Sequence, residues 1–239
     1  MLYYKLYRRR KSLYLGGSIF AILVIFMYYS NNSTDSEFNQ AESGHEEKGG
    51  QNRHLPRMAS ERININTYKI PETCKGCPGE MGNPVFLTAE ESKGIGEVYA
   101  KEFFNLRASD KISLWRSLPD FRNSACKQIN YAHDLPTASV IFIFKNERWS
   151  SILRSVYSVI NRSPRHLLEE VILVDDLSDI EEVKKPLDDY CEEHFGDIVR
   201  ILRPTKRLGL IAAKNYGGRR ARGDVLVFLD AHIEATEGW

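Results

Sequence analysis

A carboxylate and an imidazole stand two residues apart in the sequence, at Asp230 and His232. In extended backbone, residues i and i+2 project to the same side, so the two side chains could bind one divalent ion. Oxygen and imidazole ligands together suit Mn2+ better than Ca2+. Such an ion could act as a Lewis acid on a diphosphate leaving group. The alternative is that Asp230 caps a turn and His232 is an ordinary surface histidine.

A second pair of acids, Asp175 and Asp176, follows the apolar run Val171–Val174. Acids at a strand end can bind the ribose of a dinucleotide, or the base or ribose of a nucleotide sugar. A dinucleotide site also needs a glycine-rich turn after the first strand, and residues 144–149 contain no glycine. The two acidic clusters together therefore indicate a nucleotide-sugar site rather than a nicotinamide site.

Basic residues near these acids could bind the phosphates of such a ligand. Lys206, Arg207 and Arg219 are the candidates, although each could equally be a solvated surface residue. Over the whole chain, 33 Lys and Arg nearly balance 32 Asp and Glu. The net charge gives no argument for a nucleic-acid partner, and we expect none.

The elements that must position these residues are buried strands alternating with helices. Continuous apolar runs predict strands at residues 138–144, 170–175, 198–202 and 225–229. Helices are predicted between these strands. Apolar residues at helical spacing predict the first helix, directly after the first strand. A capping box at 178–181 begins the second helix, which ends at Gly196, and a third helix runs from about 209 to 222. The fold class is therefore α/β, with a doubly wound, mostly parallel sheet that binds ligands beyond its carboxyl edge.

The N-terminal region indicates a membrane anchor. Residues 13–29 form an uncharged apolar run of about 17 residues, at the short end for a transmembrane helix. The basic cluster at 8–11 predicts a cytoplasmic tail at 1–12 and a single-pass type II signal-anchor. A cleaved signal peptide is the alternative, but Met27–Tyr29 are bulky where a peptidase needs small side chains.

The chain beyond the anchor divides into three parts. Residues 30–70 are polar and predict a disordered lumenal stem. Residues 71–135 predict a lead-in with one amphipathic helix at 89–106, and residues 136–239 predict the nucleotide-sugar-binding domain. In an oxidising lumen we expect cysteines to pair, and a zinc site at the lone CxxC is the weaker alternative. The cysteines are Cys74, Cys77, Cys126 and Cys191, and glycosylation sequons occur at Asn31, Asn32 and Asn161.

Many ordered motifs closely resemble the polypeptide N-acetylgalactosaminyltransferases. In the sheet domain they are Leu135–Ile141, Asn146–Glu147, Leu153–Leu167, Glu170–Asp176, Gly209–Ile211 and Phe228–His232. In the lead-in they are Gly79–Gly82, Phe104–Leu106, Ala108–Asp110 and Arg116–Asp120. The likeness runs from about residue 79 to residue 239.

The resemblance implies a GT-A fold of glycosyltransferase family 2 type in a Golgi membrane enzyme. It implies UDP-N-acetylgalactosamine as donor, Mn2+ as cofactor and Ser or Thr of secreted or membrane polypeptides as acceptor. By position, Asp176 and Arg207, with Asp175 and Gly209 beside them, belong to the donor site. Asp230 and His232 are the implied metal ligands. No catalytic residue is assigned.

The sequence departs from the family pattern at several positions. Lys145 stands where the family has His, residues 212–214 replace an Arg-x-Arg pattern, and Ile233 replaces a Cys. Because Trp239 is the last residue, we expect a truncated GT-A domain that is inactive on its own. The alternatives are a catalytically inactive, membrane-anchored nucleotide-binding or interaction protein, and a GT-A transferase using another UDP-sugar.

Overall fold

Four parallel strands form the central sheet of the protein. The computed structural model describes residues 62–63, 75–132 and 134–239. The sheet has the order β5-β4-β3-β6, with every neighbouring pair parallel. Its strands are β3 (Ala138–Phe144), β4 (Leu168–Asp175), β5 (Val199–Leu202) and β6 (Val225–Asp230).

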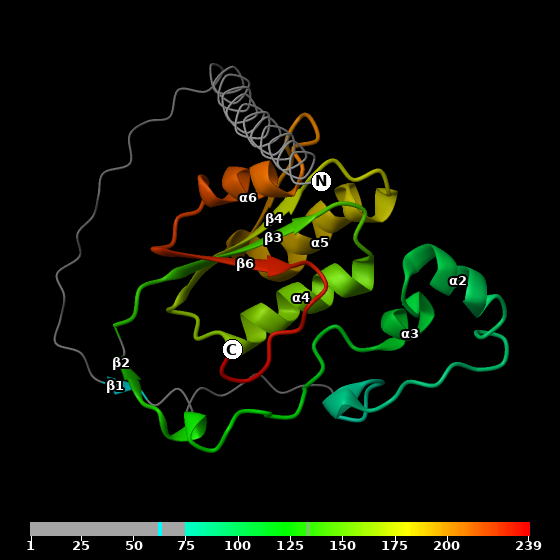
Figure 1. Cartoon of the computed structure of the whole chain (residues 1–239), viewed down its shortest axis with the longest axis horizontal. Coiled ribbons are helices and arrows are strands. Elements are labelled where there is room, and N and C mark those ends of the chain that lie inside the picture. The colour runs from blue at the N-terminus through cyan, green and yellow to red at the C-terminus, as the bar shows by residue number, and fades with distance from the viewer. Residues whose placement is uncertain (1–61, 64–74, 133) are drawn as a thin grey trace, which may run out of the picture. The chain divides into compact units, whose positions relative to one another are not determined.

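Helices cover both faces of this sheet (Figure 1). Val140 and Phe142 of β3 pack in a core with helices α4 (Trp149–Arg162) and α5 (Lys185–Phe195). Ile141, between them in sequence, packs on the other face with helix α6 (Leu210–Gly218). All three side chains are fully buried. The expected parallel sheet with helices on both faces is therefore confirmed, because a strand that excludes water from both faces needs a layer on each side.

Several predicted boundaries differ from those observed. Strand β5 begins at Val199 rather than 198, and β6 ends at Asp230 rather than 229. Strand β4 begins two residues early, at Leu168, and α6 ends at Gly218 rather than 222, where two consecutive glycines weaken the helix. The capping box at 178–181 is wrong: a 3-10 turn, η4 (Glu181–Val183), precedes α5. Pro186 occupies the first turn of α5, where a missing N–H costs nothing.

The lead-in contains short elements instead of the single helix expected at 89–106. Helix α2 (Ile95–Glu102) follows Gly94 and stops at Phe103, and both flanking residues have positive φ. Asn105 then caps α3 (Leu106–Lys111) by accepting a hydrogen bond from the Ala108 N–H. No residue of α2 is buried, so its amphipathic pattern does not reflect packing on the sheet domain. The remaining short elements are β1 (Arg62–Ile63), η2 (Glu80–Gly82), η3 (Cys126–Gln128), β2 (Tyr131–Ala132) and η5 (Gly196–Ile198).

The predicted tail, anchor and stem, together with Asn31, Asn32 and Cys74, lie outside the described residues. Within the described ranges, no helix is both long enough and apolar enough to cross a bilayer. Of the described cysteines, Cys77 is disulfide-bonded, whereas Cys126 and Cys191 are free thiols. Burial raises the pKa of the Cys191 thiol to about 12, so this thiol stays protonated at neutral pH.

The close approach of α6 to the sheet yields a stability prediction. A Cβ atom added at Gly217 would lie 2.8 Å from Ile141 Cγ2 and 2.9 Å from Val174 Cγ2, and both neighbours are fully buried. Gly217→Ala should therefore lower the free energy of unfolding by about 1–2 kcal/mol, because overpacking outweighs the gain in helix propensity. Urea denaturation measures this change.

Gly96→Ala is the matched control within a helix. A Cβ atom at Gly96 in α2 meets nothing within 4 Å. This substitution should raise the free energy of unfolding, or the local stability of α2, by up to about 1 kcal/mol. Equal unfolding midpoints for the two variants would contradict the packing argument.

Candidate functional site

The loops after β3 and β4 are hydrogen-bonded to each other at the carboxyl edge of the sheet. Lys145 Nζ donates to Asp179 Oδ2 at 2.9 Å and to the Leu177 carbonyl at 3.0 Å. Asn146 donates its backbone N–H to Ser178 Oγ at 2.8 Å, and its side-chain oxygen accepts the Asp179 N–H at 2.6 Å. Asn146 and Leu177 both have positive φ, so the two loops hold strained backbone in one arrangement.

These contacts also set the ionisation of Asp179. Hydrogen bonds from Lys145 and Asn146, followed by the charge of Lys145, hold the pKa of this carboxyl below its ordinary value. Asp179 is therefore ionised at neutral pH and keeps the two loops together.

Asp175 is the last residue of β4 and Asp176 follows it directly, and their carboxylates have different partners. Asp175 lies on the α5 side, where its carboxylate accepts the Ser178 N–H at 2.8 Å and Arg203 Nε at 3.3 Å. It is buried, and both its oxygens have protein partners. Its geometry is that of a residue that shapes the loop, and its predicted role in donor binding stays a prediction.

Asp176 holds the loop that leads into α6. Its two oxygens accept the backbone N–H groups of Leu208 at 2.6 Å and of Gly209 at 2.8 Å. Gly209 has a φ of 79°, which lets the chain turn from this carboxylate into the helix. Arg207 lies next to these residues on the same loop and is exposed. The structure thus brings Asp176 and Gly209 together, with Arg207 nearby on the same loop, and Asp176 is buried. The predicted roles of these residues in donor binding stay predictions.

Asp230 and His232 lie at the neighbouring strand end. Asp230 is the last residue of β6 and pairs in register with Ile143 of β3. Asp230 and His232 are both exposed, whereas Ala231 between them is buried in the core under α4. An exposed carboxylate and an exposed imidazole fit a divalent ion such as Mn2+ by their chemistry. Within the described residues, no group of three or more potential metal-binding side chains occurs.

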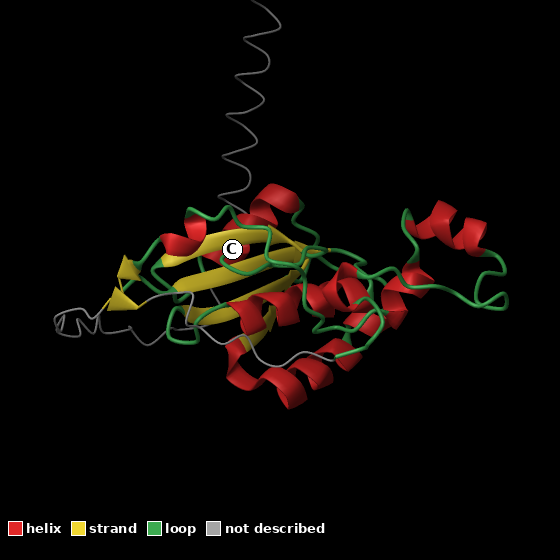
Figure 2. Ribbon diagram, turned by 90° about the horizontal axis from the view of Figure 1, so that it is seen from below, coloured by secondary structure: helices red, strands yellow, loops and turns green. Residues whose placement is uncertain are grey.

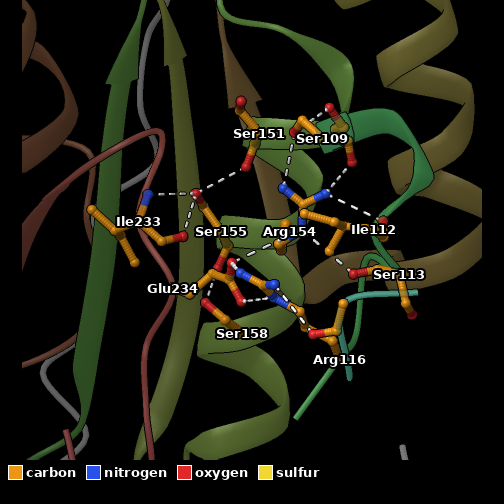
Figure 3. Close-up of polar contacts among 12 residues, drawn as sticks. Ser109, Ile112, Ser113, Arg116, Ser151, Arg154, Ser155, Ser158, Ile233 and Glu234 are labelled. Atoms are coloured by element: carbon orange, nitrogen blue, oxygen red, sulfur yellow. Dashed lines mark hydrogen bonds and ion pairs between the residues drawn. The ribbon is translucent and has the colours of Figure 1, made fainter. Parts of the chain in front are cut away.

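Sequence reasoning missed the residues that support this strand end from the α4 side. Figure 3 shows Ser155 and Ser158 of α4 and Arg116 of the lead-in converging on residues 233–235. The signal was present in the sequence, because Ser155 and Ser158 interrupt the apolar face of a predicted helix at helical spacing. Small polar residues on a buried face need hydrogen-bond partners, and here the partners are backbone groups of the segment after β6.

Comparison with known proteins places this site in context. The family model described as Glycosyl transferase family 2 matches residues 139–239. The chain is 52% identical over 164 residues to Probable N-acetylgalactosaminyltransferase 9 of Caenorhabditis elegans, covering 68% of this chain and 28% of that protein. It is 48% identical over 162 residues to Polypeptide N-acetylgalactosaminyltransferase 13 of Homo sapiens, covering 68% of this chain and 29% of that protein.

A solved structure shares the fold. The crystal structure of GalNAc-T7 with UDP, GalNAc and Mn2+ superposes with a TM-score of 0.68 at 35% sequence identity. The match covers 81% of this chain and 37% of that chain. The present chain thus spans less than a third of the length of the curated relatives named above.

The contacts of Asp176 yield a prediction. Asp176→Asn would replace one acceptor oxygen by an NH2 group facing a backbone N–H, leaving that buried donor unsatisfied. We expect a loss of about 1–3 kcal/mol in the free energy of unfolding. We also expect faster hydrogen exchange at Leu208 to Ala213, measured by mass spectrometry.

Asp189→Asn provides the control for this substitution. The Asp189 carboxylate is 57% exposed and pairs only with Lys185 along α5, so its loss should be close to neutral. Unchanged exchange at 208–213 in the Asp176 variant would show that the carboxylate does not hold this loop.

Proposed function

Because the chain belongs to the polypeptide N-acetylgalactosaminyltransferase family, we propose that it forms the donor-binding part of such an enzyme, with UDP-N-acetylgalactosamine as donor. The transfer reaction would place N-acetylgalactosamine on Ser or Thr of secreted or membrane polypeptides. The observation that carries this proposal is the superposition on GalNAc-T7, a protein crystallised with UDP, GalNAc and Mn2+, over 81% of the present chain.

The loop held by Asp176 supplies the nucleotide side of the proposed site. Its hydrogen bonds to Leu208 and Gly209 fix the backbone beside Arg207 before any ligand arrives. The exposed Arg207 guanidinium could then bind the diphosphate without rearrangement of the loop. Preorganisation of this kind lowers the entropy cost of donor binding.

Asp230 and His232 supply the metal side of the proposed site. Both are exposed at the carboxyl edge, beside the strand β3 whose following loop faces the same edge. When bound there, Mn2+ would neutralise negative charge that develops on the diphosphate. The two side chains would fix the position of the ion relative to the sheet.

The proposed setting is the Golgi membrane, with a single-pass type II topology. Its support comes from the sequence, through the basic cluster at 8–11 and the apolar run at 13–29. This topology would place the sheet domain in the lumen, where secreted and membrane polypeptides pass.

A second candidate is a protein that binds the donor without transferring the sugar. Lys145 stands at a position where the family pattern has His. Its amine donates hydrogen bonds to Asp179 and to the Leu177 carbonyl in the neighbouring loop. A side chain that is hydrogen-bonded to the loop in this way is less available to a donor.

Incubation of the 239-residue chain with UDP-N-acetylgalactosamine, Mn2+ and a Ser/Thr-rich peptide distinguishes the two candidate functions. A peptide mass increased by one sugar supports transfer, and donor binding without that increase supports the second candidate.

The proposed metal site yields a further prediction. Asp230→Ala and His232→Ala should each weaken Mn2+-dependent UDP binding by about tenfold or more, which corresponds to at least about 1.4 kcal/mol. Isothermal titration of UDP with and without Mn2+ measures the effect.

His166→Ala is the matched control for these variants. His166 is also exposed, but it precedes β4 at the amino edge of the sheet. Its replacement should leave Mn2+-dependent UDP binding unchanged. Full metal dependence in both the Asp230 and His232 variants would remove these residues from the site.

A further inference from the structure

A bidentate ion pair joins the lead-in to the segment that follows β6. Arg116 Nε donates to Glu234 Oε2 at 2.9 Å, and Arg116 Nη2 donates to Glu234 Oε1 at 2.6 Å. Each side chain is 16% exposed. Bidentate geometry and partial burial make this a stronger contact than an exposed ion pair. The pair ties together residues that are 118 positions apart in the sequence.

Glu234 cannot serve as a third ligand beside Asp230 and His232 while this pair is formed. In a fully extended chain, residues 230, 232 and 234 would all project to one side. Beyond β6 the chain instead turns, and Glu234 faces Arg116 and, at 4.0 Å, Arg154 of α4 (Figure 3). The carboxylate therefore balances guanidinium groups on the α4 side of the sheet.

The backbone on either side of Glu234 is fixed by α4. Ser155 Oγ accepts the Ile233 N–H at 3.0 Å and lies 2.8 Å from the Ile233 carbonyl oxygen. Ser158 Oγ accepts the Ala235 N–H at 2.8 Å. Ala235 itself is buried in the core. The segment that begins directly after His232 thus has both its backbone and its charged side chain bound.

The negative charge of Glu234 compensates the buried positive charge of Arg154. Burial lowers the pKa of the Arg154 guanidinium, and the charge of Glu234 opposes that effect. Arg154 also donates to the carbonyls of Ser109 and Ile112 in the lead-in. Loss of the Glu234 charge would leave a buried cation less compensated, which is costly.

We propose that Glu234 is a positioning residue for the metal site: paired with Arg116, and with its backbone bound by Ser155 and Ser158, it holds the chain that presents Asp230 and His232 to a divalent ion. This inference rests on the proposed function, in which those two residues bind Mn2+. It gives the lead-in a role in ion binding, because Arg116 comes from that part of the chain.

The test compares Glu234→Gln with Glu102→Gln in the whole 239-residue chain. Glu102 of α2 forms a similar ion pair with Arg148, in which the Glu102 side chain is 12% exposed and the Arg148 side chain 19% exposed. This ion pair also joins the lead-in to the sheet domain. It does not touch residues 230–235. Mn2+ affinity in the presence of UDP is measured by electron paramagnetic resonance of the free ion. We expect Glu234→Gln to weaken Mn2+ binding by about tenfold and Glu102→Gln to change it by no more than about twofold.

Hydrogen exchange of the peptide covering residues 228–236 provides a second readout. It should become faster in the Glu234 variant and stay unchanged in the Glu102 variant. If Glu234→Gln does not fold, Arg116→Lys, which keeps the charge but loses the bidentate geometry, takes its place with the same expected direction.

Three outcomes overturn the inference. Wild-type Mn2+ affinity in a folded Glu234 variant would show that the ion pair does not position the ligands. An equal loss in the Glu102 variant would show a general loss of stability instead. If the unmodified chain shows no Mn2+ binding with UDP, the metal site of the proposed function fails, and the inference fails with it. The first two outcomes leave the proposed function standing.

Discussion

The burial of β3 and β4 on both faces is the constraint on which the rest of the structure depends. Val140 and Ile141 are adjacent, point to opposite faces and are both fully buried, as are Ile172 and Leu173 in β4. Neither face of such a strand can meet water, so helices in the connections between the strands must together cover both faces of the sheet. The strands then run parallel, so the loops that follow them lie at one edge of the sheet. Figure 2 shows the strands of the sheet side by side. The position of the candidate site is therefore a consequence of the packing of the core.

Buried and exposed acids have different roles at that edge. Asp175 and Asp176 are buried, and their oxygens accept hydrogen bonds from the loops around them, which shapes the backbone near a ligand. Asp230 and His232 are exposed, so their polar atoms remain open to solvent or to an ion. Burial decides this division, because a buried carboxylate must be satisfied by protein donors whereas an exposed one need not be. The proposed donor site would then combine a rigid loop with accessible ligands.

The lead-in is joined to the sheet domain by ion pairs as well as by apolar contacts of Leu114 and Trp115. Helix α2 buries no residue, yet Glu102 pairs with Arg148 before α4, and Arg116 pairs with Glu234 after β6. Arg154 of helix α4 donates hydrogen bonds to backbone carbonyls of the lead-in. The first two contacts connect the lead-in to segments that follow β3 and β6, and the third connects it to helix α4. Ion pairs with fixed geometry define the position of one backbone relative to another more sharply than apolar contacts do, because they are directional.

The sequence by itself determined the order of the elements and the identity of the residues at the strand ends. The apolar runs at 138–144 and 225–229 predicted strands, and the residues that follow them had to lie at one edge of a parallel sheet. Most residues of β3 are buried, whereas β6 lies at the end of the described sheet with Val225, Leu226 and Phe228 exposed. Only the tertiary structure decided that Asp176 is buried against Leu208 and Gly209, that α2 stops at Phe103, and that Glu234 turns away from Asp230 and His232 to meet Arg116. The contacts of Asp176 and of Glu234 join residues that are 32 and 118 positions apart in the chain. Local periodicity carries no information about such contacts, because it records which face of an element is apolar and not which distant donor or acceptor will meet it.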